Sequence, residues 1–187
     1  MPLKPPPPLE TPRLRVRPVA REDLADLLAV NGDAEVTRYL PYAPWKDATD
    51  ANAWLVRMSA MQAQGTALQL VVERRDVPRV IGTCLLFRFD EPSSRVELGY
   101  VLARDHWRGG WMTEALTALL DCAFGPLELR RMEADVNPAN QASQRLLERL
   151  GFEREGVRRE RWMEKGTPQD SVMFGLLARD WQARTRA

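Results

Sequence analysis

Two adjacent glycines, Gly109 and Gly110, stand directly in front of a helical pattern in the stretch RDHWRGGWMTEAL. Before them, residues 94–103 carry apolar side chains at alternate positions, which is typical of a strand. After them, apolar residues recur at helical spacing from Met112 onward. A helix N-terminus exposes unpaired N–H groups and a positive dipole end. The glycines therefore either let an anion reach the backbone or only complete a tight strand-to-helix turn.

The rest of the 187 residues continues the alternation of strand and helix patterns. We expect seven strands, at residues 13–18, 67–74, 79–89, 94–103, 130–136, 151–159 and 171–181. We expect helices at Arg21–Val30, Asp33–Tyr39 and Ala48–Gln62, one from Met112, and one that Asn140 caps and Gly151 ends. This order predicts a mixed sheet flanked by helices, in one domain over residues 10–187.

Composition narrows the class of protein. Residues 1–9 are rich in proline and predict an extended, disordered tail. The net charge of +1 disfavours a nucleic-acid partner. Cys84 and Cys122 lie in apolar runs and are expected to be buried thiols, and with His106 as the only histidine we expect no metal site. No apolar run approaches membrane-spanning length, so we expect a soluble, cytoplasmic protein without a membrane partner.

A second motif, NPANQAS, precedes the helix that Asn140 caps. The hydroxyl of Ser143 is expected beside the first turn of this helix. Alone, Asn140 indicates simple capping and Ser143 a solvated serine. The motif indicates a functional site only in combination with the glycine loop.

In combination, ELGYVLARDHWRGGWMTEAL and NPANQASQRLLERLGFEREG resemble the GNAT N-acetyltransferases, in particular their RimJ/RimL-type branch. The resemblance extends to TPRLRVRP and YLPYAPW and covers about residues 10–182. It implies an α+β fold with a mixed, mostly antiparallel sheet. It also implies acetyl transfer from acetyl-CoA to an amine by direct attack in a ternary complex.

The resemblance also implies roles for individual residues. Backbone groups of the strand end would meet the pantetheine and thioester, and the loop with the helix start would hold the pyrophosphate. The expected cofactor-binding residues are Val101, Leu102, Arg108, Gly109, Gly110, Trp111, Met112, Thr113 and Asn140. Asn140 would position the pantetheine or a water, and Ser143 would donate a proton to the departing thiolate. Trp111 either covers the edge of the cofactor or simply packs.

One departure from the family pattern concerns the loop. Arg108 stands where the family has its first glycine, and Asp105 stands where glutamine or arginine is usual. Gly110 keeps the second glycine. Arg108 either pairs with the pyrophosphate or distorts the loop that binds it.

The sequence says less about the residues that bind the acceptor amine than about those that bind the cofactor. Glu97 is the candidate general base, since it lies on the strand face opposite Tyr100 and shortly before the loop; Glu133 and Asp135 are weaker alternatives. Tyr39, Tyr42 and Trp45 either line the acceptor groove or only anchor their proline-broken loop. The expected acceptor is the N-terminal α-amine of a protein, of the ribosomal kind. The alternatives are a small amine (a polyamine, an amino acid or an aminoglycoside) and a CoA-binding module without turnover. RimL-like proteins also suggest a homodimer.

Overall fold

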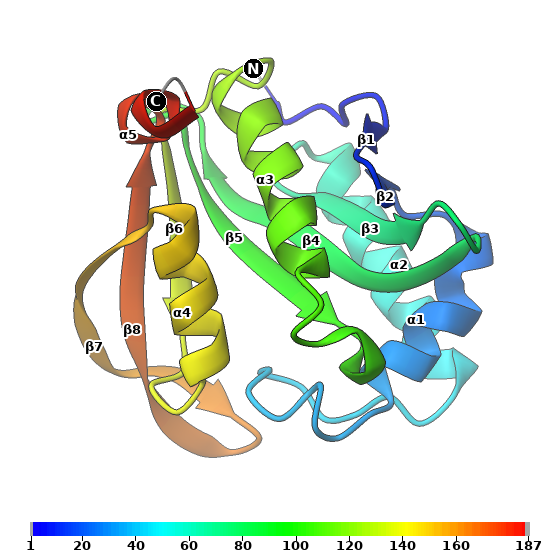
Figure 1. Ribbon diagram of the computed structural model, residues 1–187. Coiled ribbons are helices and arrows are strands. Elements are labelled where there is room, and N and C mark those ends of the chain that lie inside the picture. Colours follow the sequence, from blue (N-terminus) through cyan, green and yellow to red (C-terminus); the bar gives the residue numbers. More distant parts are fainter. Residues whose placement is uncertain (1, 186–187) are drawn as a thin grey trace.

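The structure is a computed structural model, and it describes residues 2–185. One sheet runs through the molecule in the strand order β1-β2-β3-β4-β5-β6-β8-β7 (Figure 1). Its strands are Leu9–Glu10 (β1), Leu14–Pro18 (β2), Leu68–Arg74 (β3), Arg79–Asp90 (β4), Arg95–Leu102 (β5), Arg131–Val136 (β6), Glu153–Glu164 (β7) and Thr167–Leu177 (β8). The α-helices are Leu24–Asn31 (α1), Ala48–Ala63 (α2), Trp111–Phe124 (α3), Gln141–Leu150 (α4) and Ala178–Thr185 (α5). Short 3₁₀ turns precede α1 at Arg21–Asp23 (η1) and α3 at Arg104–His106 (η2).

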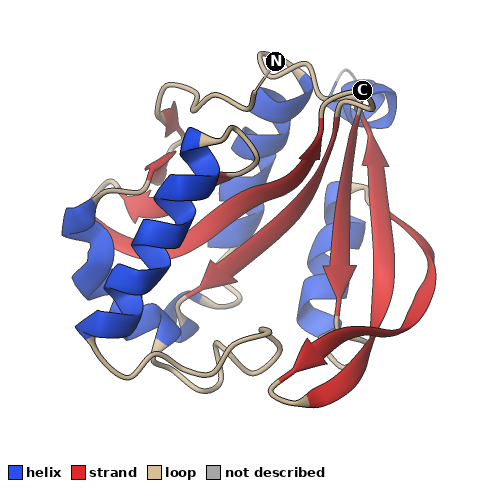
Figure 2. Cartoon of the chain, turned by 180° about the vertical axis from the view of Figure 1, so that it is seen from behind, coloured by secondary structure: helices blue, strands red, loops and turns tan. Residues whose placement is uncertain are grey.

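Helices cover both faces of the sheet. Helices α3 and α4 lie on the face that Figure 1 shows in front, while α1 and α2 lie behind it, as the reverse view in Figure 2 confirms. The larger core lies under α3 and α4 and contains fully buried Leu116, Met132 and Phe174. A smaller core joins α1 and α2 to the other face around Leu27 and Val71. These two cores fix the sheet between two layers of helix.

The central feature of the sheet is its single parallel pair, between β5 and β6. All other neighbouring strands in the described chain run antiparallel. The parallel pairing joins only Arg95–Glu97 to Arg131–Glu133. Beyond it the two strands separate, and Figure 1 shows them spreading apart below their common end. One edge of β5 therefore has no strand partner from residue 98 onward.

The predicted α+β class with a mixed, mostly antiparallel sheet is confirmed, with three corrections. The sheet has eight strands because Leu9–Glu10 adds a short β1 to its edge. Residues 33–39 form turns instead of a helix, since so short a segment, closed by Pro41, cannot propagate a helix. The last strand ends at Leu177, and α5 follows because Trp181 packs into the core and its indole donates to Asp121 Oδ1 at 2.8 Å.

The N-terminal segment is not the solvated tail that its prolines suggested. Leu3 is buried in the larger core, and its backbone N–H donates to the carbonyl of Gly65 at 3.1 Å. Gly65 itself has a positive φ, and a Cβ there would collide with Pro2. The neighbouring Lys4 and Pro5 are exposed. One apolar side chain thus docks a segment that is otherwise hydrophilic and proline-rich.

Replacing Leu3 by alanine should lower the free energy of unfolding by about 2–3 kcal/mol, at the lower end for a buried leucine, because the site lies at the rim of the core. Urea denaturation monitored by circular dichroism measures this loss. Lys4→Ala is the matched control and should change the stability by less than about 0.5 kcal/mol. Equal effects of the two substitutions would show that Leu3 is not docked.

Candidate active site

The site begins where β5 leaves β6. Val101 pairs with Thr83 of β4 on one side, and its other side faces the opening between the strands. The carbonyl of Leu102 is already occupied, because it accepts a hydrogen bond from Trp107 Nε1 at 2.8 Å. Of the two residues expected to meet the pantetheine, Val101 therefore keeps more of its backbone free for a ligand.

The N-terminus of α3 lies at the end of this strand. Gly110 is its N-cap, with φ of +75°, and it supplies no side-chain cap. By contrast, the side chains of Asp47 and Asn140 cap α2 and α4. The first N–H groups of α3, on Trp111, Met112 and Thr113, are therefore available to an external anion. This fits the expectation that the loop binds a pyrophosphate.

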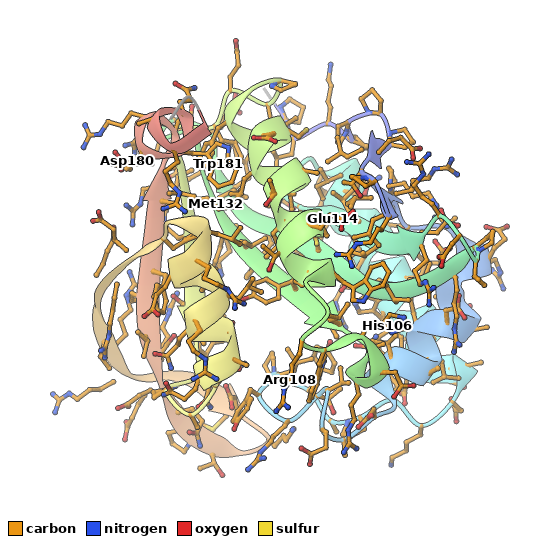
Figure 3. All side chains as sticks on the ribbon, viewed as in Figure 1. His106, Arg108, Glu114, Met132, Asp180 and Trp181 are labelled. Atoms are coloured by element: carbon orange, nitrogen blue, oxygen red, sulfur yellow. The ribbon has the colours of Figure 1, made fainter. Side chains whose placement is uncertain are left out.

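The loop itself has an unusual backbone. Arg108 has φ of +63°, a left-handed conformation that costs a non-glycine residue about 1–2 kcal/mol. Gly109 is required by packing, since a Cβ there would lie 2.6 Å from Trp111 Nε1. The side chain of Arg108 is exposed, at the end of the loop that opens α3 (Figure 3). A positive side chain thus stands free beside the uncapped helix end.

A network from the N-terminal segment holds this loop, and sequence reasoning missed it. Arg13 Nε donates to Glu114 Oε2 at 2.6 Å, and Thr11 Oγ1 donates to Glu114 Oε1 at 2.6 Å. Arg13 also donates to the carbonyl of Gly109 at 3.1 Å and stacks on Trp111, 4.1 Å from its ring centre. Burial would raise the pKa of Glu114, but the hydrogen bonds from Thr11 and Arg13 outweigh it and lower that pKa. Glu114 lies in the stretch ELGYVLARDHWRGGWMTEAL that carries the family resemblance, which was the available signal.

The indole of Trp111 is therefore used in packing. Besides Arg13, the guanidinium of Arg74 lies 5.3 Å from its ring centre, and His106 meets it edge-on at 5.8 Å. Burial, and then the charge of Arg74, lower the pKa of His106. His106 thus packs against Trp111 behind the loop.

On α4, Asn140 and Ser143 lie as the motif predicts. Asn140 Oδ1 accepts from the backbone N–H of Ser143 at 3.1 Å, which confirms Asn140 as the N-cap. The hydroxyl of Ser143 lies 2.6 Å from the hydroxyl of Tyr100 on β5. This contact spans the space between β5 and α4 on the α3/α4 side of the sheet. Tyr100 is a second residue that sequence reasoning missed, although its alternation with Leu98 pointed to this face.

Glu97 lies on the opposite face and is the last residue of β5 that pairs with β6. It is 8% exposed, and Arg88 Nη1 donates to its Oε2 at 2.9 Å. Burial and the nearby carboxylate of Asp135 raise the pKa of Glu97, and Arg88 opposes this shift only in part. Glu133 is held differently, since Arg95 and Arg131 both donate to it. The expected cofactor side and the candidate base thus lie on two faces of the same opening.

Of the three aromatic residues expected near an acceptor, two serve the smaller core. Trp45 is 9% exposed and packs on Trp54, with ring centres 5.4 Å apart. The Tyr42 hydroxyl donates to Asn31 Oδ1 at 2.9 Å, and burial raises the pKa of Tyr42 to about 12. These two side chains anchor their loop, whereas Tyr39 is half-buried and lies under Arg38.

Residues 2–185 contain no group of three or more His, Cys, Asp or Glu side chains that could hold a metal ion. In the same residues, no helix has both the length and the apolar character needed to cross a bilayer.

Comparison with known proteins agrees with this geometry. The family model described as "Acetyltransferase (GNAT) domain" matches residues 13–153, and the chain belongs to this family. It is an N-acetyltransferase of the RimJ/RimL-like kind, and enzymes of the family use acetyl-CoA.

Relatives of the chain fall in the same class. The N-acetyltransferase p20 of Bacillus licheniformis is 36% identical over 92% of this chain and 97% of its own. The [ribosomal protein uS5]-alanine N-acetyltransferase of Escherichia coli is 32% identical over 92% of each chain. The Vibrio cholerae spermidine N-acetyltransferase, solved with CoA and spermine, shares the fold with a TM-score of 0.80 at 22% identity, covering 92% of this chain and 99% of its own.

Glu114→Gln should weaken CoA binding roughly three- to tenfold, because the partly exposed pair with Arg13 shapes the loop before the ligand arrives. Isothermal titration calorimetry with CoA measures the change in Kd. Glu148→Gln, on the exposed face of α4, should leave the Kd unchanged. An unaltered Kd in Glu114→Gln would remove the network from cofactor binding.

Proposed function

We propose that this protein transfers the acetyl group of acetyl-CoA to the N-terminal α-amine of a protein, of the ribosomal kind. The observation that carries the proposal is Glu97, a buried carboxylate with a raised pKa at the opening between β5 and β6. An α-amine has a pKa of about 7.7–8.0, so roughly a tenth is already neutral near pH 7. A lysine amine, with a pKa of about 10.4, is almost wholly charged. A single carboxylate base is suited to the α-amine.

In this reaction the α3 side would bind the cofactor, and the side chains of Glu97 and Ser143 would transfer protons. When bound, acetyl-CoA supplies a thioester whose carbonyl carbon the amine attacks. The uncapped N–H groups of α3 and the side chain of Arg108 would hold its pyrophosphate. Glu97 would take a proton from the amine, directly or through a water. Ser143, hydrogen-bonded to Tyr100, would give a proton to the leaving thiolate.

A small-molecule amine is the second candidate, and one contact favours it. Lys165, at the turn between β7 and β8, donates to the carbonyls of Thr37 and Arg38 at 2.9 and 3.1 Å. This bridge ties the β7–β8 turn to the loop after α1. Such a bridge would limit the length of an acceptor that enters beside these turns, which favours a short acceptor over a long peptide.

The proposal includes a cytoplasmic location, which the free state of Cys84 and Cys122 supports. The homodimer suggested by RimL-like proteins stays a prediction, and light scattering of the purified protein would test it.

The acceptor is tested with three probes: peptides starting with alanine or serine, the same peptides blocked at the N-terminus but carrying a lysine, and spermidine. Release of free CoA is followed with a thiol reagent. We expect kcat/KM for the free N-termini to exceed that for the other probes by about 100-fold, as when a site is built to recognise one group. A preference for spermidine would overturn the α-amine proposal and support the small-amine candidate.

A base with a raised pKa fixes the direction of the pH dependence. Glu97 accepts a proton only when ionised, so kcat/KM should rise with pH through the pKa of Glu97. Because that pKa is raised, the midpoint should lie above the ordinary glutamate value of about 4.3. Glu97→Gln should lower kcat by about 10²–10⁴-fold and remove this limb of the profile. A limb that persists in Glu97→Gln would assign the base to another residue.

Ser143→Ala should lower kcat by about 10–10³-fold while leaving the Kd for CoA nearly unchanged, because a thiolate leaves tolerably without help. Stopped-flow single turnovers measure the chemical step. If Ser143 and Tyr100 act as one unit, the double variant with Tyr100→Phe should be no slower than the worse single variant. An unchanged kcat in Ser143→Ala would exclude this hydroxyl from proton transfer.

A further inference from the structure

The face of β6 that turns away from α3 and α4 carries buried carboxylates. Asp135 follows Glu133 by two residues, so it shares the face of Glu133 and of its register partner Glu97. The Asp135 side chain is only 3% exposed, although no helix within residues 2–185 covers this face of β6 and β8 (Figure 2). Something other than a helix must therefore shield it.

Side chains of β7 and of one residue of β4 with a left-handed backbone cover Asp135. Arg161 Nε donates to Asp135 Oδ2 at 3.2 Å, as Arg88 does to Glu97. Both guanidiniums lie over the ring of Trp162, at 4.5 Å for Arg88 and 5.3 Å for Arg161. Arg88 has φ of +52° where the β4–β5 register is interrupted, and this conformation accompanies its position over Trp162. A tryptophan with two arginines thus covers two carboxylates.

Two buried polar groups on this face have no hydrogen-bond partner among the described residues. Asp135 Oδ1 is fully buried, and residues 2–185 offer it no donor. The hydroxyl of Ser171 is likewise buried without a partner in the described chain. Ser171 precedes Met173 by two residues on β8, and Met173 is opposite Asp135, so the serine shares this face. A buried carboxylate oxygen without a donor is costly, which points to a donor that arrives with a ligand.

Gly99 provides room beside Glu97 on the same face. A Cβ at Gly99 would make ordinary contacts of 3.7 and 4.0 Å with Phe87 and Leu85, and its φ is not in the left-handed region. Neither packing nor backbone geometry within the chain therefore requires a glycine here. A glycine inside a strand often marks the close approach of a ligand.

We propose that Asp135 and Glu97 together bind the acceptor amine as a primary ammonium, with Asp135 Oδ1 as the binding anion and Glu97 as the proton acceptor. An ammonium brings three N–H donors and one positive charge, which suits two neighbouring buried carboxylates. The proton moves from the ammonium nitrogen to a Glu97 oxygen, and the neutral amine keeps the electron pair that attacks the thioester. This inference rests on the proposed function only in that the acceptor is an amine.

The first test uses propylammonium chloride as the probe, with 1-propanol as its uncharged counterpart, in thermal shifts of the CoA-loaded protein. Propylammonium should stabilise the wild type and 1-propanol should not. Asp135→Asn should lose the effect. Glu133→Gln, two residues away on the same face but held by two arginines, should keep it. No stabilisation of the wild type, or undiminished stabilisation of Asp135→Asn, would overturn the proposal.

A second variant keeps the test valid if Asp135→Asn does not fold. Gly99→Ala adds one methyl group and no charge, and it should weaken propylammonium binding while CoA binding is unchanged. In turnover, Asp135→Asn should raise the acceptor KM about tenfold or more, as expected for a lost charge-assisted hydrogen bond, with a smaller change in kcat. Unaltered kinetics in both variants would refute the site.

The two proposals fail separately. If peptides are not acetylated but propylammonium binding depends on Asp135, the α-amine acceptor is wrong and the ammonium site stands. If peptides are acetylated equally well by Asp135→Asn, the acceptor is right and the ammonium site is wrong.

Discussion

The short pairing between β5 and β6 is the constraint on which the site depends. Three residues of each strand pair, and then the strands part. Because the strands part, Tyr100 can reach Ser143 of α4 on one face, while Glu97 and Asp135 remain close on the other. A continuous parallel pair would have joined the two strands by backbone hydrogen bonds along their whole length. The chemistry proposed for this protein needs the strands to separate, since the amine and the thioester are expected to approach from opposite sides.

The loop before α3 combines a strained backbone with support from a distant segment. Arg108 occupies a left-handed conformation that glycine adopts more easily. The loop remains in this shape because Arg13 binds both Glu114 and the carbonyl of Gly109. The segment before β2 thus supports a loop nearly a hundred residues away in the sequence. An arginine at the family's glycine position adds charge beside the helix end without placing a bulky side chain inside the packed turn.

Local patterns predicted most of the fold. The alternation in β5, the amphipathic stripe of α3 and the cap at Asn140 are decided by neighbours in sequence, and the structure has them as expected. The docking of Leu3 and the end of β8 at Leu177 depend on tertiary contacts that no local pattern contains. The same holds for the site. Ser143 and Glu97 were proposed from motifs and a strand face, whereas Tyr100 and Arg13 make their contacts with partners distant in sequence.

The bridge from Lys165 to the carbonyl of Thr37 joins turns that are 128 residues apart. Neither turn belongs to β5, α3 or α4, which make up the expected cofactor side. Changes in these two turns would therefore leave the contacts within β5, α3 and α4, where the cofactor is proposed to bind, unaltered. The turns beside the proposed acceptor side and the elements of the proposed cofactor side thus belong to separate segments of the chain, so a change in one does not require a change in the other.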